Sequence, residues 1–304
     1  MERVVVTGAT SMIGAALIRE CIANHVEVLA IVRRQSARLD RLPQSELVRL
    51  YECELDELRA LESSGQLYDV FYHFAWAYTS KENRDNPVLQ ESNIQYTLEA
   101  VELAHRLGCR KFVFAGSQAE YGRTDEVITP STEINPFLSY GIAKYAAGKL
   151  SMKLCSDYGM SHIWGRIFSV YGCYDNEGTM LCYGIDQFIN GKTARFSAAA
   201  QMWDYLFEDD AGKIFYLLGE RVNESKVYCI ANGKPQPLKE YIMELKNAFG
   251  KEAECVFENE LDSRAVSLQA DVSGLICDIG YTPDTSFEEG IQKMIQFRKS
   301  RRNL

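Results

Sequence analysis

The chain lacks several features that mark common classes of protein. Its nine cysteines are scattered and form no Cys-x-x-Cys pair, so neither a zinc knuckle nor a thioredoxin-type motif is indicated. No apolar run approaches the roughly 20 residues that a helix needs to cross a bilayer, so we expect no membrane association. The net charge is −9, and the basic segment 298–302 is short, so nucleic acid is not an expected partner. The four histidines show no ligand spacing, and we predict no metal site.

Two further absences concern the compartment in which the protein works. The cysteine count is odd and no signal peptide is recognised, which fits reduced thiols in the cytosol. The first expected strand begins at Arg3 and leaves no room for a targeting segment. We therefore expect a cytoplasmic protein. Its 304 residues and hydrophobic content of 46% suit one large α/β domain, or such a domain with a smaller partner.

Short apolar runs alternate with helical patterns through the first half of the chain. The expected strands are residues 4–6, 26–32, 48–51, 70–74, 111–115 and 161–167. The expected helices are residues 13–23, 87–107 and 139–158. Strands that are apolar on both faces and separated by helices predict an α/β fold with a parallel sheet covered on both sides. After residue 171 the pattern breaks into shorter pieces. We expect two of these to return to the main sheet and the others to form a small cap.

The first strand runs directly into Thr7-Gly-Ala-Thr-Ser-Met-Ile-Gly14 and then into a helix. Glycines in a strand–turn–helix let the backbone approach a pyrophosphate, which rests on the helix N-terminus. Gly8 and Gly14 are in place, whereas Ser11 replaces the expected middle glycine with a small residue whose hydroxyl suits a phosphate contact. The turn therefore predicts a dinucleotide cofactor. The residues expected to hold its phosphates are Gly8, Thr10, Ser11, Met12, Ile13 and Gly14.

The end of the second expected strand lies where the adenosine ribose of a dinucleotide binds. An NAD-specific protein usually has an acidic residue there, but this chain has Val32-Arg-Arg-Gln-Ser36. Two guanidiniums offer a 2′-phosphate charged, bidentate partners. We therefore predict that NADP(H) is preferred over NAD(H), with Arg33, Arg34 and Ser36 as contacts. The alternative is that both arginines are ordinary surface charges.

Tyr140 and Lys144 lie four residues apart on an expected helix and therefore share a face. A tyrosine normally titrates near pH ~10, and a nearby cation lowers this pKa by favouring the phenolate. Ser117 lies upstream in Ala-Gly-Ser-Gln and suits a hydrogen bond to the same substrate oxygen. Together these residues predict proton transfer at a carbinol or carbonyl oxygen while another group moves a hydride. By itself the spacing also fits an ordinary surface pair.

The glycine turn, Ser117 and the Tyr140/Lys144 pair occur in the order found in the extended short-chain dehydrogenase/reductases. More narrowly, the chain resembles their nucleotide-sugar epimerase/dehydratase/reductase branch. Further segments carry the likeness nearly end to end: residues 73–76, 92–97, 166–172, 203–210 and 270–290. The resemblance implies Ser117, Tyr140 and Lys144 as the catalytic residues.

The resemblance also implies a Rossmann-type doubly wound parallel sheet with a smaller C-terminal substrate-binding domain. We expect the dinucleotide-binding domain at 1–170 with returning segments at about 203–231, and the substrate-binding domain mainly at 171–202 and 232–304. Helices 87–107 and 139–158 commonly form a dimer interface in this family, so we expect a homodimer. The implied partner is a nucleotide-sugar.

Further binding residues follow from the matched positions of the family. Those implied for the cofactor are Glu54, Leu55, Phe74, Ala75, Trp76, Asn93 and Ile167, besides Tyr140 and Lys144 themselves. Asn93 matches a helix asparagine that is mainly structural. Those implied for the substrate are Tyr78, Gln118, Phe168, Ser169 and Trp203. Trp203 replaces the arginine that usually contacts the diphosphate, and it either stacks on a base or sugar or packs in the core.

The departures from the family pattern bear on the reaction. Dehydratases of this family place Asp-Glu after the catalytic Ser/Thr, whereas this chain has Gln118-Ala119, so elimination of water is disfavoured. Glu120 lies one position later, and we expect it to be structural or to bind substrate. NADPH-dependent reduction of a nucleotide-linked 4-keto-6-deoxyhexose at C4 is then the preferred interpretation. A nucleotide-sugar 4-epimerase with tightly bound NAD is the alternative, and a non-catalytic dinucleotide-binding scaffold is the third.

Overall fold

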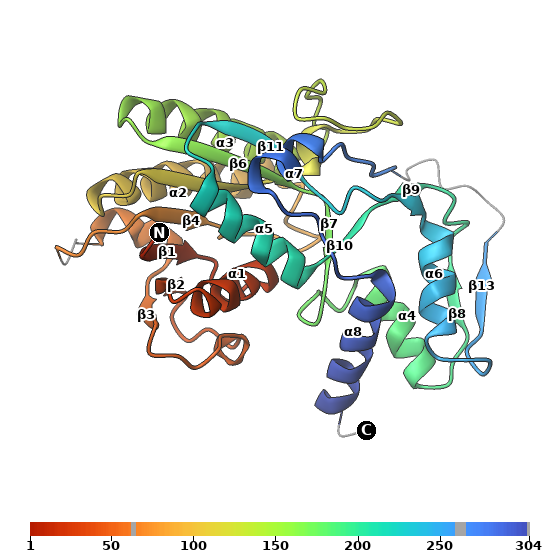
Figure 1. The fold of residues 1–304 in the computed structure, drawn as a ribbon. Helices are drawn as coiled ribbons and strands as arrows, with labels where there is room; N and C mark the ends of the chain where they lie inside the picture. Colours follow the sequence, from red (N-terminus) through yellow and green to blue (C-terminus); the bar gives the residue numbers. More distant parts are fainter. Residues whose placement is uncertain (62–64, 259–265, 303–304) are drawn as a thin grey trace.

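The main body of the protein is a seven-stranded parallel sheet, seen in a computed structural model that describes residues 1–61, 65–258 and 266–302 (Figure 1). The strand order is β3-β2-β1-β4-β5-β6-β11, and each neighbouring pair is parallel. The strands are β1 (Arg3–Thr7), β2 (Glu27–Val32), β3 (Val48–Glu52), β4 (Val70–His73), β5 (Lys111–Ser117), β6 (Ser161–Ile167) and β11 (Lys226–Ile230). This is the predicted α/β fold with a doubly wound parallel sheet.

Helices cover both faces of this sheet because its strands are apolar on both sides. They are α1 (Met12–Ala23), α2 (Pro87–Arg106), α3 (Ser139–Asp157) and α5 (Glu208–Arg221). Val4 and Val6 of β1 belong to the core formed with α1 and α5, whereas Val5 between them belongs to the core formed with α2 and α3. Because successive side chains of a strand point to opposite faces, β1 contributes to a hydrophobic layer on each side of the sheet.

The bounds of α2 show how local sequence sets an element. The side chain of Asn86 caps the helix by accepting hydrogen bonds from the N–H groups of Val88 and Leu89, and Pro87 occupies the first helical position. Gly108 follows the helix with φ +76°, a left-handed conformation that suits glycine. Both ends of α2 are therefore set by local sequence.

The C-terminal part forms a smaller unit with its own core. Its helices are α4 (Met180–Ile189), α6 (Leu238–Asn247), α7 (Ser273–Ile279) and α8 (Phe287–Arg301). Its short strands pair as β7 (Ser169–Tyr171) with β10 (Tyr205–Phe207), β8 (Ala194–Phe196) with β13 (Cys255–Phe257), and β9 (Met202–Trp203) with β12 (Gln236–Pro237). The core of this unit gathers side chains of α4, α6 and α8, while α7 packs against α5 and β11. Figure 1 shows α4, α6 and α8 beside the main sheet.

One expectation about this part needs correction. Two C-terminal segments were expected to return to the main sheet, but only β11 joins it among the described residues. The β10 segment is an apolar run that could form a strand, but it pairs with β7 in a separate two-stranded sheet. The position beside β6 is taken by β11, whose register runs from Lys226 opposite Ile163 to Ile230 opposite Ile167.

The carboxyl ends of the strands bring the predicted site residues to one edge. Thr7 is in register with His73, and Ser117 is in register with Ile167. The turns that follow β1, β4, β5 and β6 therefore leave the sheet at the same edge, as expected of a ligand site in an open α/β sheet.

Candidate active site

The turn after β1 has the backbone that a phosphate cradle needs. Gly8 has φ +68°, and a Cβ there would lie 2.6 Å from the backbone nitrogen of Ala75. A Cβ at Gly14 would lie 2.3 Å from the carbonyl oxygen of Gly8. Larger residues at either position would force the turn apart. The residues present therefore fit a dinucleotide pyrophosphate, which rests on exposed N–H groups at a helix N-terminus.

Ser11 replaces the middle glycine without loss of the turn because it caps α1. Its Oγ accepts a hydrogen bond from the N–H of Gly14 at 3.0 Å. Met12 and Ile13 are the first two residues of α1, so their N–H groups have no partner within the helix. The Thr10 carbonyl accepts from Arg41 Nη1 at 3.5 Å, which ties the turn to η1 (Leu39–Arg41).

The predicted ribose end contains carboxylates as well as the two arginines. Arg34 forms an ion pair with Glu57 at 2.7 Å, and its backbone N–H donates to Glu54 Oε1 at 3.0 Å. The hydrogen bond from Arg34 holds the pKa of the Glu57 carboxyl below its usual range. Arg33 is exposed, and no carboxylate of the described residues forms an ion pair with it. The sequence predicted two arginines without a carboxylate partner. Arg33 agrees with this expectation, whereas Arg34 does not.

The sequence-based interpretation missed Glu57 at this end of the site. Glu54 begins η2 (Leu55–Ala60), and a capping box with Glu57 fixes this short helix beside the end of β2. The signal available was the Glu-x-x-Glu spacing of a capping box, but only the sheet order brings β3 and its following turn next to β2. Leu55 is partly buried against the core, and the Ser36 Oγ accepts from the N–H of Arg38 at 3.4 Å.

The turn after β4 is rigid and lies next to the glycine turn. His73 is 1% exposed, with Nδ1 2.8 Å from Thr7 Oγ1, and burial lowers its pKa to about 3, so it is neutral. Phe74 packs edge-on against Phe215 with ring centroids 4.8 Å apart. The N–H of Ala75 donates to Thr7 Oγ1 at 3.5 Å.

Two buried amides of α2 hold the same turn from the other side. Asn93 Oδ1 accepts from the N–H of Ala77 at 2.7 Å, and its Nδ2 donates to the Ala77 carbonyl at 3.2 Å. Both ends of this amide are thus used by the backbone, which agrees with a mainly structural asparagine. The indole N–H of Trp76 donates to Gln90 Oε1 at 2.9 Å. The sequence-based interpretation did not single out Gln90.

Ser117, Tyr140 and Lys144 come together at the carboxyl end of β5. Ser117 ends β5, and the other two lie in the first turns of α3, which packs against β5. The side chain of Ser117 acts to lower the pKa of Tyr140, which favours the phenolate. Trp76 packs edge-on against the ring of Tyr140 with centroids 6.0 Å apart. The structure therefore joins a phenol, a hydroxyl and an ammonium that the chain order separates.

The electrostatics of this group differ from the expectation. Burial raises the pKa of Tyr140, while the charge of Arg84 and the side chain of Ser117 lower it, and the burial effect is the largest. Burial also lowers the pKa of Lys144 to about 7. The ammonium of Lys144 donates to the Ala115 carbonyl at 2.7 Å and lies 3.7 Å from the ring centroid of Trp76. The expected net lowering of the Tyr140 pKa by Lys144 is therefore wrong for this structure, because desolvation outweighs the nearby charges.

Glu120 lies beside this group, and its carboxylate already accepts three hydrogen bonds from the protein. It is 0% exposed and accepts from the N–H of Ser117 at 2.7 Å, from Arg166 Nε at 2.7 Å and from Trp164 Nε1 at 3.3 Å. Three donors compensate the buried carboxylate. This agrees with a structural role, in which Glu120 fixes the backbone of Ser117.

The predicted substrate-side residues occupy several elements. Gln118 starts η3 (Gln118–Glu120) and is partly buried, and Tyr78 is 40% exposed with φ +60°. Ser169 Oγ accepts from the indole N–H of Trp203 at 2.8 Å, which ties β7 to β9. Phe168 is 7% exposed and lies in the main core. Their contacts with a substrate remain predictions.

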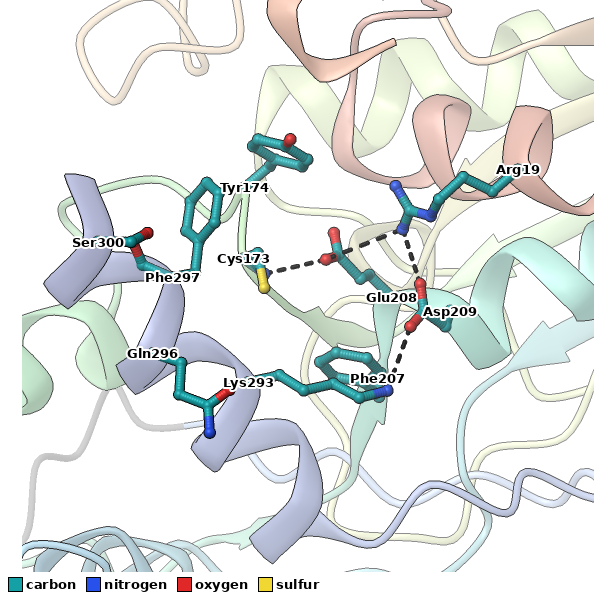
Figure 2. Close-up of a pocket in the computed structure, with 10 residues that line it drawn as sticks. All are labelled: Arg19, Cys173, Tyr174, Phe207, Glu208, Asp209, Lys293, Gln296, Phe297 and Ser300. Carbon is teal, nitrogen blue, oxygen red and sulfur yellow. Dashed lines mark hydrogen bonds and ion pairs between the residues drawn. The ribbon is translucent and has the colours of Figure 1, made fainter. Parts of the chain in front are cut away.

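A charged hollow of about 500 Å³ lies away from these residues, and none of the predicted site residues lines it (Figure 2). Figure 2 shows Asp209 between Arg19 of α1 and Lys293 of α8, with ion-pair distances of 2.7 and 3.4 Å. Glu208, beside it, is 3% exposed. The ion pairs beside this hollow connect α8 to the main body.

No group of three or more His, Cys, Asp or Glu side chains among the described residues is arranged to hold a metal ion. None of the helices in the described segments is both long enough and apolar enough to cross a bilayer. All nine cysteines are free.

Both the fold and the placement of its polar groups are those of dinucleotide-dependent α/β enzymes. The model of the NAD dependent epimerase/dehydratase family matches residues 4–231, and the chain belongs to this family. A dTDP-4-dehydro-6-deoxyglucose reductase of Escherichia coli is 23% identical over 96% of each chain.

Solved structures of similar fold cover nearly the whole chain. A UDP-N-acetylglucosamine 4-epimerase from Methanobrevibacter ruminantium superposes with a TM-score of 0.87 at 20% identity, covering 99% of each chain. A UDP-glucuronic acid 4-epimerase from Bacillus cereus, solved in complex with NAD, gives a TM-score of 0.84 at 20% identity and covers 98% of this chain and 97% of that one. At these identities the superpositions establish the fold.

Proposed function

We propose that the protein reduces the C4 carbonyl of a nucleotide-linked 4-keto-6-deoxyhexose, with NADPH as the external reductant. The observation that carries the proposal is the grouping of Ser117, at the carboxyl end of β5, with Tyr140 and Lys144 in the first turns of α3, which packs against β5. A proton donor placed there suits an oxygen whose carbon faces a nicotinamide. The Gln118-Ala119 sequence supports reduction over elimination, since neither residue is an acid or base of the kind that elimination needs.

The chain's own residues then have separate roles in the step. When bound, the nicotinamide supplies a hydride to C4 of the sugar. The Tyr140 hydroxyl gives its proton to the oxygen at C4, so that the carbonyl becomes a hydroxyl and Tyr140 becomes a phenolate, which solvent reprotonates. Ser117 donates a hydrogen bond to the same oxygen as negative charge develops on it. Gly8, Gly14 and the start of α1 would hold the pyrophosphate.

The preference for NADP(H) over NAD(H) is part of this proposal. It is supported by Arg33, which is exposed at the end of β2 and has no carboxylate partner among the described residues. Arg34 already pairs with Glu57, so we expect it to contribute less to a 2′-phosphate than Arg33 does.

A second candidate is a 4-epimerase that retains NAD. It is supported by the two solved structures described above, which are both 4-epimerases, one of them in complex with NAD. Such an enzyme would use Ser117, Tyr140 and Lys144 in the same way, but would return the hydride to its own substrate.

One assay separates these candidates. The purified protein is incubated with NADPH or NADH and a set of nucleotide-linked 4-keto-6-deoxyhexoses, and the loss of reduced-cofactor absorbance is followed. We expect oxidation of NADPH in a 1:1 ratio to sugar alcohol formed, and slower turnover with NADH. If no cofactor is oxidised, but ordinary nucleotide-sugars are inverted at C4 by protein that retains NAD through purification, the epimerase is correct.

A homodimer through α2 and α3 is also proposed. These helices pack against each other within the chain and expose Val88, Ile142 and Leu150, whose side chains are 75%, 52% and 48% accessible. Apolar side chains of this size on adjacent helices suit a shared interface.

A further inference from the structure

Arg84 lies against the catalytic tyrosine although it is distant in sequence from Ser117, Tyr140 and Lys144. Its guanidinium carbon is 4.1 Å from the centroid of the Tyr140 ring, and its charge acts to lower the pKa of Tyr140. The main chain adds a second tie, since the N–H of Tyr140 donates to the Arg84 carbonyl at 3.1 Å. A guanidinium within 6 Å of an aromatic ring is attracted to it.

The segment that carries Arg84 is fixed at both ends. Gln90 is 1% exposed, and its Nε2 donates to the carbonyls of Tyr78 at 2.9 Å and Asn83 at 3.2 Å. Asp85 accepts from the N–H of Ser139 at 3.0 Å, directly before Tyr140 in α3. The backbone on either side of Arg84 is therefore tied to α2 and α3, which holds the guanidinium over the tyrosine.

Lys144 is engaged elsewhere in the same site. Its ammonium donates to the Ala115 carbonyl and lies over the indole of Trp76, whereas its distance to the Tyr140 ring centroid is 5.9 Å. Arg84, by contrast, has no ion pair with any carboxylate of the described residues, and its buried Nε has no hydrogen-bond partner there. Of the two cations, Arg84 is therefore the one that lies closer to the Tyr140 ring and whose charge lowers the pKa of Tyr140.

We propose that Arg84 is a second cation of the proton relay, which stabilises the phenolate of Tyr140 once its proton has moved to the substrate oxygen, while Lys144 serves the cofactor side. This rests on the proposed function only in that Tyr140 is the proton donor. Arg84 keeps its own proton throughout, so the step remains a single transfer from the tyrosine hydroxyl to the substrate oxygen.

The charged groups that face Tyr140 come from three elements. They are Arg84 from the segment before α2, Glu120 from η3, and Lys144 one turn further along α3. Burial raises the pKa of Tyr140 most, the charge of Arg84 opposes it, and the charge of Glu120 adds to the rise. Without Arg84, fewer groups oppose the effects of burial and of Glu120, so the pKa of Tyr140 is expected to rise further.

The test follows the ionisation of Tyr140 directly in the full-length protein. Tyrosine labelled with ¹³C at Cζ is incorporated, and the Tyr140 signal is assigned by its loss in Tyr140→Phe. We expect the midpoint of its titration to rise by about one to three pH units in Arg84→Gln, as removal of an opposite charge at this distance implies. Arg84→Lys should restore part of the shift. Arg301→Gln removes an arginine that lies 4.9 Å from the ring of Phe297 and should leave the midpoint unchanged.

Kinetics supply a second measurement if hydride transfer is found. A rise of one pH unit corresponds to about a tenfold loss of kcat at fixed pH in the alcohol-oxidation direction, with KM for the nucleotide-sugar nearly unchanged. An unmoved Tyr140 midpoint in Arg84→Gln would overturn the inference, and so would a rise in KM alone. If Arg84→Gln does not fold, Arg84→Met keeps an unbranched chain over the ring and tests the same charge. The titration needs no substrate, so its result can be interpreted even if the proposed reaction is not found.

Discussion

At Tyr140, burial and charge act in opposite directions on one hydroxyl. The spacing to Lys144 predicted a tyrosine with a lowered pKa, but burial in the structure raises the pKa instead. A raised pKa keeps Tyr140 protonated at neutral pH, which suits a residue that must deliver a proton during reduction. Lys144 has the complementary shift, to a pKa of about 7, because burial disfavours its charge.

Replacement of Tyr140 by phenylalanine should remove the proton donor and little else. We expect Tyr140→Phe to lower kcat by a factor on the order of 10² or more, since this is the usual contribution of a positioned acid. Cofactor affinity, measured by fluorescence titration with NADPH, should stay near that of the wild type. Turnover close to the wild-type rate would show that another group donates the proton.

At the scale of single elements, the start of α5 combines a favourable and an unfavourable feature. Glu208 and Asp209 lie in its first turn, where negative charge complements the helix dipole. Asp209 is partly exposed and paired with Arg19 and Lys293, but Glu208 is buried under Gly172 and Cys173, and its Oε2 has no partner among the described residues. Burial raises the pKa of Glu208 to about 7.

Glu208→Gln should therefore stabilise the protein in a defined pH window. A carboxyl whose folded pKa is about 7 and whose ordinary pKa is 4.5 binds more protons when folded, so the wild type loses stability as pH rises from about 4.5 to 7. The variant lacks this loss. Its gain in Tm should be near zero at the acidic end, grow through the window and level off above it. Thermal melts at several pH values measure the difference.

Asp209→Asn is the matched control on the same turn. It removes exposed ion pairs and should change Tm little across this range, since such pairs contribute about 0–1 kcal/mol. A gain for Glu208→Gln that does not depend on pH would contradict the assignment of the buried charge.

At the scale of the whole molecule, the sheet and the C-terminal unit have different tasks. The main sheet collects the turns after β1, β4 and β5 at one edge, while a separate core holds α4, α6 and α8 beside it. The exposed apolar side chains of α2 and α3 lie on neither of these cores. Their exposure on adjacent helices favours an assembly in which a second copy covers them.

Charges placed on this face should separate the copies. We expect Ile142→Lys combined with Leu150→Lys to convert a dimer into a monomer, as measured by light scattering during size-exclusion chromatography. Met243→Lys on α6 is the control, since Met243 is 37% exposed on a helix of the C-terminal unit. A monomeric wild type, or a double variant that remains dimeric, would contradict this interface.

The sequence alone predicted the parallel sheet, the glycine turn and the grouping of Ser117, Tyr140 and Lys144. Apolar runs of strand length, the caps of α2 and the turn at Gly8 are local features, and local backbone preferences suffice to predict them. The tertiary structure decided which charges meet. Arg84 reaches Tyr140 because Gln90 and Asp85 tie its segment to α2 and α3, and Glu57 reaches Arg34 because β3 follows β2 in the sheet. Likewise, burial reversed the expected pKa shift of Tyr140, since desolvation depends on packing from elements that lie far apart in the chain.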